Sequence, residues 1–287
     1  MYAGSQPGRG GGIRGCFEKM LPDLAHIPGL LREGWSLLAD STNREKCLAD
    51  IRLLTKEWER RYNGMAELTD EKCAFAAEAD PYRKQEFVYI HYDAKGTPAG
   101  YMVYRRERDG QEQRLVCSRF VFRDRVGIEG LLTLAKSMQA DHKSIVFTLP
   151  SSICLDPLID EWSLGAYRRS DASLGMARIV NVEAALKAAR YRGSGSLTIE
   201  ILDGQIPENN AVFIVCFEEG RAVSVTRDAE GKAALRMDIS EFSRFLIGAA
   251  DVSALALSRR VYGYSQEDLE LLGQIFYKKP CFLTEYF

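Results

Sequence analysis

The sequence is poor in histidine, has no closely spaced cysteines and contains no long apolar run. Its three histidines are scattered, and the motifs of metalloproteases, P-loop NTPases and serine hydrolases are missing. The seven cysteines include no Cys-x-x-Cys pair, which argues against a zinc site and against a disulfide framework. The longest apolar run, residues 211–217, is far shorter than the roughly 18 residues that a membrane span needs. We therefore expect no metal and no membrane span.

Neither sign of charge dominates the sequence. Lys and Arg number 38 and Asp and Glu number 40, so the formal net charge is −2. Binding to nucleic acid needs a basic excess that neutralises phosphates, so we expect no nucleic-acid partner. The amino-terminal residues lack the apolar core of a signal peptide, and the widely spaced cysteines are typical of reduced thiols. Both observations favour a cytoplasmic location.

Glycine is concentrated near the amino terminus, where residues 8–15 read Gly-Arg-Gly-Gly-Gly-Ile-Arg-Gly. Apolar residues from Ile13 to Leu21 follow at helical spacing, which predicts a glycine-rich loop leading into a helix. Glycine N–H groups at a helix amino terminus, with an arginine nearby, are suited to binding a pyrophosphate. Two alternatives remain open. The spacing Gly10-x-Gly12-x-x-Gly15 matches the dinucleotide-binding fingerprint, although no strand precedes it, and the segment can also be an unstructured terminus.

Hydrophobic periodicity divides the rest of the chain into two units of strands and helices. The first unit has a predicted helix at 51–62 with Gly64 as its cap, strands at 86–92, 101–105 and 114–122, a helix at 128–138 and a strand at 144–149. In the second unit we predict strands at 176–182, 197–202, 212–217 and 222–226, and helices at 183–190, 240–247 (N-cap Ser240) and 266–276 (N-cap Ser265). This order of elements indicates an α+β protein.

The carboxyl terminus is aromatic and apolar up to its last residue, Phe287, whereas most termini are polar. Such a tail is expected to dock onto the protein. The α-carboxylate of Phe287 would then be partly buried, and a carboxylate whose pKa is raised by desolvation can act as a base. A tail that only fills a hydrophobic groove is the alternative.

Together these features resemble the GNAT-type N-acetyltransferases of the enhanced-intracellular-survival family. The resemblance is carried by GRGGGIRGCFEKML at 8–21, MARIVNV at 176–182, AAL at 184–186, RGSG at 192–195, NN at 209–210 and EYF at 285–287. It implies a GNAT-like mixed sheet with helices, followed by a sterol-carrier-protein-like α/β domain. The implied domains are a remnant of a first GNAT unit plus connector at 1–48, a second GNAT-like domain at 49–170 and the sterol-carrier-like domain at 171–287.

The resemblance also implies an activity and its residues. Family members use acetyl-CoA, without a metal, to acetylate a primary amine on an aminoglycoside-like or lysine-like acceptor, which is a small molecule or a peptide, and they assemble as homo-oligomers. The carboxylate of Phe287 would deprotonate the amine. The residues implied to bind acetyl-CoA are Arg9, Gly10, Gly11, Gly12, Ile13 and Arg14.

Two departures from the family pattern favour alternatives to a fully active acetyltransferase. Most of a first GNAT unit would be missing before residue 8, and no Tyr-x-x-Phe-Gly-Tyr-like segment, which holds the family's proposed general acid, occurs between Leu24 and Arg52. The loop at 123–130 lacks the acetyl-CoA-binding pattern. The alternatives are therefore an acetyltransferase impaired by truncation, a non-catalytic module that binds a hydrophobic ligand or a protein, and a scaffold with no small-molecule site.

Overall fold

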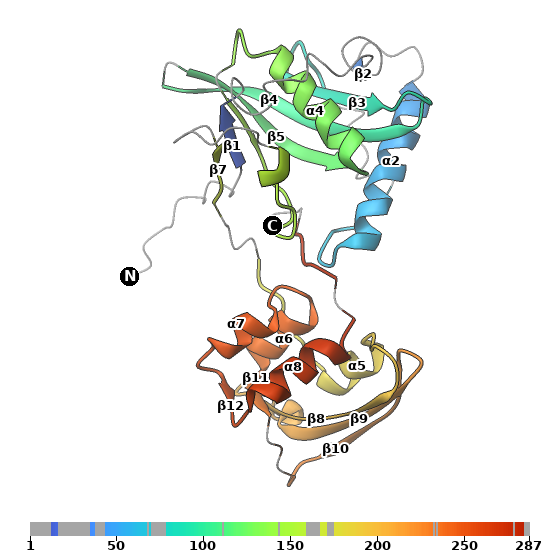
Figure 1. Cartoon of the computed structure of the whole chain (residues 1–287), viewed down its shortest axis with the longest axis vertical. Coiled ribbons are helices and arrows are strands. Elements are labelled where there is room, and N and C mark those ends of the chain that lie inside the picture. Colours follow the sequence, from blue (N-terminus) through green and yellow to red (C-terminus); the bar gives the residue numbers. More distant parts are fainter. Residues whose placement is uncertain are drawn as a thin grey trace. The chain divides into compact units, whose positions relative to one another are not determined.

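The computed structural model describes residues 13–16, 35–37, 44–67, 69, 79–110, 112–142, 144–158, 167–170, 175–231, 233, 235–277 and 279–283. These residues divide into two compact units, each built around its own sheet (Figure 1). The first unit takes its residues from Met1–Arg61 and Met65–Leu174. The second takes Tyr62–Gly64 and Gly175–Tyr286, so a short piece of chain that follows a long helix of the first unit belongs to the second.

A mixed sheet forms the centre of the first unit, in the strand order β2-β3-β4-β5-β6-β1-β7. Its middle is an antiparallel meander of the strands predicted at 86–92, 101–105 and 114–122, followed by the predicted helix and by a strand parallel to the last strand of the meander. These elements are β3 (Glu86–Tyr92), β4 (Pro98–Asp109), β5 (Glu112–Phe122), α4 (Arg125–Ser137) and β6 (Ser144–Phe147). The remaining strands are short: β1 (Ile13–Cys16), β2 (Trp35–Leu37) and β7 (Tyr167–Arg168), with a 3-10 turn, η3, at Asp156–Leu158.

Two helices cover opposite faces of this meander. Successive side chains of β4 point to opposite faces of the sheet. The Tyr101 hydroxyl is hydrogen-bonded to Thr55 of α2 (Arg44–Arg61) at 2.8 Å, whereas the neighbouring Met102 packs in a buried cluster with Leu131 of α4. Both helices also bury apolar side chains, such as Leu54 of α2 and Leu131 of α4, as the helical pattern at 51–62 and 128–138 predicted.

His91 and Gly130 mark a close approach between the sheet and α4. A Cβ atom on Gly130 would collide with the imidazole ring of His91, so only glycine lets the helix lie this close to β3. The imidazole is 3% exposed, and its burial lowers the pKa of His91 against the opposing charges of Asp93 and Asp124. His91 is thus a neutral packing residue of the core at pH 7.

The helix predicted from Ile13 onward is wrong for residues 13–16, because these residues form β1. This strand lies between β6 and β7 and pairs antiparallel with both, with Ile13 opposite Phe147 and Gly15 opposite Tyr167. Pairing with distant strands overrides the helical spacing of the apolar residues, which is a weak local signal. Residues 17–21 lie outside the described part of the chain. The strands β1 and β2, from the segment expected to hold a remnant and a connector, thus extend the first unit's sheet.

The second unit contains a five-stranded sheet in the order β10-β9-β8-β11-β12. The strands predicted at 197–202, 212–217 and 222–226 are present and pair antiparallel, and β11 pairs parallel with β8. The strands are β8 (Gly195–Leu202), β9 (Ala211–Glu218), β10 (Arg221–Asp228), β11 (Arg236–Asp238) and β12 (Val261–Tyr262). The helices are α5 (Val182–Ala188), α6 (Ile239–Leu246), α7 (Val252–Ala256) and α8 (Gln266–Ile275), with a 3-10 turn, η4, at Pro207–Asn209.

Local capping signals set where two of these helices begin. Ser265 is the N-cap of α8, as predicted, and it forms a reciprocal capping box with Asp268. The N-cap of α6 is Asp238 rather than the predicted Ser240, and its carboxylate accepts the N–H of Ser240 at 2.8 Å. An aspartate two positions earlier satisfies the free N–H groups at least as well as a serine does.

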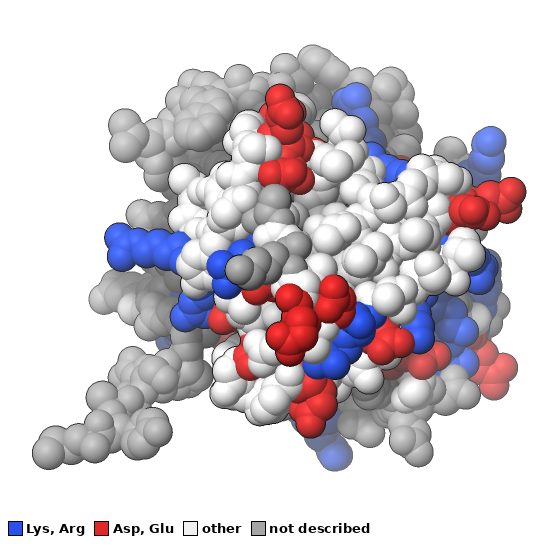
Figure 2. Space-filling model, turned by 90° about the horizontal axis from the view of Figure 1, so that it is seen from below, with Lys and Arg blue, Asp and Glu red and all other residues white. Residues whose placement is uncertain are grey.

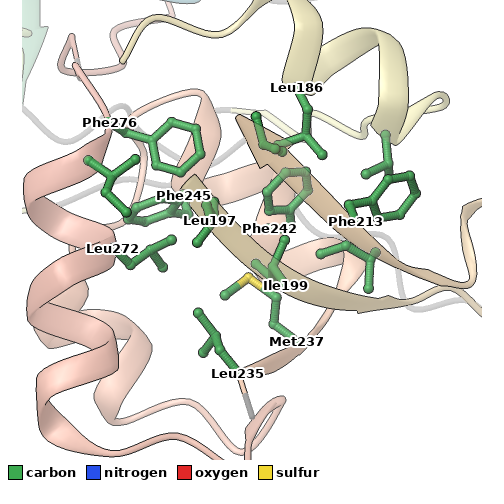
Figure 3. Close-up of a cluster of buried hydrophobic side chains, with 14 of the residues drawn as sticks. Leu186, Leu197, Ile199, Phe213, Leu235, Met237, Phe242, Phe245, Leu272 and Phe276 are labelled. Atoms are coloured by element: carbon green, nitrogen blue, oxygen red, sulfur yellow. The ribbon is translucent and has the colours of Figure 1, made fainter. Parts of the chain in front are cut away.

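The apolar face of the second sheet packs directly against α6 and α8 (Figure 3). Phe213 of β9 and Phe242 and Phe245 of α6 are each at most 1% exposed. Leu197 and Ile199 of β8 and Leu272 of α8 complete the same cluster. Large side chains of the protein therefore fill the space between the sheet and the helices.

The strand predicted at 176–182 is wrong, because residues 175–181 are irregular. Two of their backbone groups bond to side chains instead of to a neighbouring strand: the N–H of Ile179 donates to Ser243 Oγ at 3.0 Å, and the carbonyl of Val180 accepts from the Asn209 amide at 3.4 Å. Arg178 binds the buried carboxylate of Asp203. Sequence alternation does not distinguish such a segment from a strand.

Asp203 gathers several donors around one buried carboxylate. Burial disfavours its ionisation, but hydrogen bonds from Asn209, the N–H groups of Gln205 and Ile206, and Arg178 outweigh this effect and lower the pKa of Asp203 to about 2. The Asn209 amide also lies beside the carbonyl of Val180. This cluster therefore ties the irregular segment to the loop between β8 and β9.

We predict that Asp203 makes the second unit sensitive to acid. Because the pKa of Asp203 is lowered to about 2 in the folded state, its stabilising effect is present above about pH 4 and is lost as the pH falls towards 2. Asp203→Asn should lower the free energy of unfolding at pH 7 by about 2 kcal/mol and flatten the acid limb. Urea unfolding followed by circular dichroism measures this change.

Glu230→Gln, at an exposed position of the second unit, is the matched control and should leave the curve unchanged. All three tryptophans lie in the first unit's part of the sequence, at Trp35, Trp58 and Trp162, so tryptophan fluorescence records that unit separately. An Asp203→Asn variant as stable as the native protein at pH 7 would contradict the role of this cluster.

Candidate functional site

The carboxyl ends of the parallel strands β5 and β6 are the place in this fold where a ligand would be expected. Only Arg114, Leu115 and Val116 of β5 pair with β6, although β5 continues to Phe122. Helix α4 begins directly after β5. A crevice beside the carboxyl ends of parallel strands, next to a helix amino terminus, is the usual ligand position in open α/β sheets.

Aromatic side chains of the protein fill this crevice on the α4 side. The rings of Phe120 and Phe147 are stacked, with centroids 4.3 Å apart. Phe120 is 2% exposed, and Phe147 and Leu155 are each 1% exposed. The place where β5 and β6 separate is therefore part of the hydrophobic core.

The amino terminus of α4 is also engaged by the protein itself. The carboxylate of Asp124 accepts the N–H of Gly127 at 3.1 Å and so occupies the position that an anion would take. Arg123 makes two hydrogen bonds to Glu57, at 2.9 and 2.8 Å, and this carboxylate raises the pKa of Arg123. Arg125 is paired with Glu129 at 2.6 Å. The basic side chains of this loop are thus neutralised by internal partners, in agreement with the absence of the acetyl-CoA-binding pattern here.

The predicted site residues lie mostly outside the described part of the chain. Arg9, Gly10, Gly11, Gly12 and Phe287 are not among the described residues. Ile13 and Arg14 lie in β1, where their backbones pair with Phe147 and Val146 of β6. The glycine-rich segment therefore continues through Ile13 into β1, beside the carboxyl end of β6, and the helix expected to begin at Ile13 is replaced by a strand.

Sequence reasoning missed Asp124 and the pair formed by Phe120 and Phe147. Asp124 had a readable signal, because an aspartate just before an apolar helical pattern is a common N-cap. The two phenylalanines had none, because their contact depends on the parallel pairing of β5 and β6.

Other chemistries find little support in the described residues. His142 is buried like His91, and burial lowers its pKa as well. Within the ranges given above, no cluster of three or more His, Cys, Asp or Glu side chains is placed to hold a metal ion. None of the described helices combines the length and the apolar character required to cross a bilayer. On the face shown in Figure 2, acidic and basic side chains are interspersed around uncharged areas.

We predict that Phe120→Ala strongly destabilises the first unit. Removing a fully packed ring leaves a cavity, so the free energy of unfolding should fall by about 3–5 kcal/mol in urea unfolding followed by tryptophan fluorescence. Tyr82→Ala, at a position that is 79% exposed, is the control and should change it by no more than about 0.5 kcal/mol. A loss below about 1 kcal/mol for Phe120→Ala would mean that the ring borders an open crevice.

Comparisons with known proteins agree with this architecture. Residues 182–284 match the family model of the sterol carrier protein domain. A search of curated protein sequences finds no match. Three similar solved structures are GCN5-related N-acetyltransferases from Anabaena variabilis ATCC 29413 and Kribbella flavida, and Eis1 from Mycobacterium abscessus.

The likeness to these structures extends over nearly the whole chain but is remote in sequence. The Anabaena structure has a TM-score of 0.71 at 16% identity and covers 97% of this chain and 68% of its own. The corresponding values are 0.66, 16%, 97% and 65% for the Kribbella structure and 0.64, 17%, 96% and 67% for Eis1. This chain thus spans about two thirds of their length. The chain combines the fold of the GCN5-related N-acetyltransferases with a carboxy-terminal sterol carrier protein domain, as the resemblance in sequence predicted.

Proposed function

We propose that the protein transfers the acetyl group of acetyl-CoA to a primary amine. The observation that carries this proposal is the likeness in fold to GCN5-related N-acetyltransferases over 96–97% of the chain. The sterol carrier protein domain at 182–284 is consistent with the sequence resemblance from which this activity was expected. We further propose an aminoglycoside-like or lysine-like acceptor, a cytoplasmic location and a homo-oligomeric assembly.

Acetyl-CoA is proposed to bind at the glycine-rich segment Arg9–Arg14 rather than at α4. The amino terminus of α4 is capped by Asp124, and the crevice beside it holds Phe120 and Phe147, so a ligand there would have to displace core side chains. Within this segment, Ile13 pairs with Phe147, which is the last residue of β6. Glycine N–H groups and the guanidinium groups of Arg9 and Arg14 are suited to a pyrophosphate.

The carboxylate of Phe287 is the proposed general base. It accepts a proton from the amine, the amine nitrogen attacks the thioester carbonyl, the C–S bond breaks and coenzyme A leaves as its thiolate. No general acid is assigned to the thiolate, since the family's tyrosine segment has no counterpart between Leu24 and Arg52.

A non-catalytic binding module is the second candidate, and the filled crevice of the first unit favours it. The core of the second unit argues against a hydrophobic ligand there, because Phe213, Phe242 and Phe245 already occupy the space between its sheet and its helices. In this second function the two units would present surfaces to a protein partner, without turnover of acetyl-CoA.

We predict that extending the chain beyond Phe287 abolishes acetyl transfer. Two added residues, Gly-Ser, would displace the carboxylate, and loss of a general base should lower kcat by about a hundredfold or more. Phe287→Ala keeps the carboxylate and should retain more activity than the extended chain. Release of coenzyme A in the presence of a panel of primary amines measures the rate.

The same two residues added at the amino terminus are the control for a nonspecific effect of the extension. Unchanged turnover in the carboxy-terminal extension would exclude the carboxylate as the base. No turnover of acetyl-CoA by the native chain with any amine would favour the binding module instead.

A further inference from the structure

Residues 279–283, near the carboxyl end, contact three glycines and Asn63 of the second unit; these four residues, Asn63, Gly64, Gly175 and Gly248, are called the groove below. A Cβ atom on Gly248 would collide with the carbonyl of Lys279, and one on Gly175 would collide with the side chain of Leu283. A Cβ atom on Gly64 would lie 3.1 Å from the Sγ atom of Cys281. Alternate residues of the segment, Lys279, Cys281 and Leu283, thus each lie beside a glycine.

Asn63 holds the middle of this segment by backbone pairing. Its N–H donates to the carbonyl of Pro280 at 2.9 Å, and its carbonyl accepts the N–H of Phe282 at 2.7 Å, as in a parallel bridge. On the other side of the groove the N–H of Cys281 donates to the carbonyl of Gly248 at 3.2 Å. The segment is therefore held as an added strand between two pieces of chain.

The side chain of Asn63 secures the wall of the groove. Its amide donates to the carbonyl of Ile247 at 3.1 Å and lies 3.4 Å from the carbonyl of Lys279. It therefore links the turn that contains Gly248 to the start of the held segment. Beside it, the rings of Tyr62 and Phe282 meet edge to face, with centroids 6.0 Å apart.

Gly64 and Gly248 differ from the turn glycines Gly96, Gly110 and Gly193. Gly96, Gly110 and Gly193 also have positive φ, but an added Cβ would meet nothing within 4 Å there. Gly64 and Gly248 combine a positive φ, of 81° and 83°, with a close approach of the carboxy-terminal segment. Backbone conformation alone explains the turn glycines, whereas the groove glycines are also needed to admit a peptide.

We propose that this groove positions the carboxyl end of the chain for the reaction, with Asn63 as its positioning residue. The inference rests on the proposed function, in which the carboxylate of Phe287 takes the proton from the amine. Phe287 is four positions beyond Leu283, and an extended chain advances at most about 3.6 Å per position, so holding Leu283 keeps Phe287 within roughly 14 Å of it. Release of the segment from the groove would lower the effective concentration of the Phe287 carboxylate at the amine.

The first experiment measures docking without any reference to activity. In the full chain, Cys281 is half-buried in the groove, whereas Cys216 on β9 is exposed, so the rate of alkylation of Cys281 relative to Cys216 in the same sample reports release of the segment. Burial also raises the pKa of the Cys281 thiol, which slows its reaction in the docked state. Peptide mapping by mass spectrometry gives both rates.

Two pairs of variants separate the groove from general destabilisation. Gly248→Ala is compared with Gly193→Ala, which has the same kind of positive φ but open space around its Cβ position. Asn63→Ala is compared with Asn181→Ala, which removes the N-cap of α5 in the same unit. We expect alkylation of Cys281 to accelerate at least about tenfold in Gly248→Ala and in Asn63→Ala, and by less than about twofold in the two controls. Equal acceleration of Cys281 alkylation in a variant and its control would show that the groove does not hold the segment.

The second experiment measures acetyl transfer by the same four variants. For a positioning role, Gly248→Ala and Asn63→Ala lower kcat at an unchanged KM for acetyl-CoA, and the two controls retain native values. Released Cys281 with a native kcat would overturn the positioning role. If the native chain shows no transfer but the alkylation contrast holds, the proposed function fails and the groove stands as a peptide-binding site.

Discussion

The pairing of Asn63 with the carboxy-terminal segment is the constraint on which the arrangement of the chain depends. Asn63 bonds to Lys279, which lies 216 positions later in the sequence. Because Tyr62–Gly64 belongs to the second unit, the chain leaves the first unit after α2 and returns to it at Met65. The sterol carrier protein domain, matched at 182–284, is therefore completed by three residues from far outside that range.

The positions where each unit would ordinarily hold a ligand are filled by the protein itself. In the first unit, Phe120, Phe147 and the Asp124 cap occupy the crevice beside β5, β6 and α4. In the second, aromatic side chains such as Phe242 fill the space between sheet and helices (Figure 3). The proposed chemistry is therefore assigned to the glycine-rich segment and to the carboxyl end.

The elements with strong local signals could be predicted from the sequence. The meander of β3, β4 and β5 follows from alternation and turn residues, and α8 follows from its Ser265 cap. Residues 13–16 were misread because their strand is set by pairing with β6, and 176–182 because its hydrogen bonds go to side chains. Gly64 was read as a helix cap by a local rule, although it makes room for Cys281, a contact that no local pattern contains. For the same reason the groove could not be predicted, whereas the docking of the tail could be expected from its apolar composition.

The central claim is that Arg9–Arg14 bind acetyl-CoA, and calorimetric titration of the full chain with acetyl-CoA tests it. The claim predicts saturable binding to one site per chain, with a dissociation constant on the order of micromolar, and a loss of that binding when Arg9 and Arg14 are replaced by alanine. Asp124→Ala, at the cap of α4, should leave the binding unchanged, because acetyl-CoA is not placed there. A folded chain that shows no heat of binding would contradict the claim, and binding strengthened by Asp124→Ala, which removes the carboxylate from the α4 amino terminus, would move the site to α4.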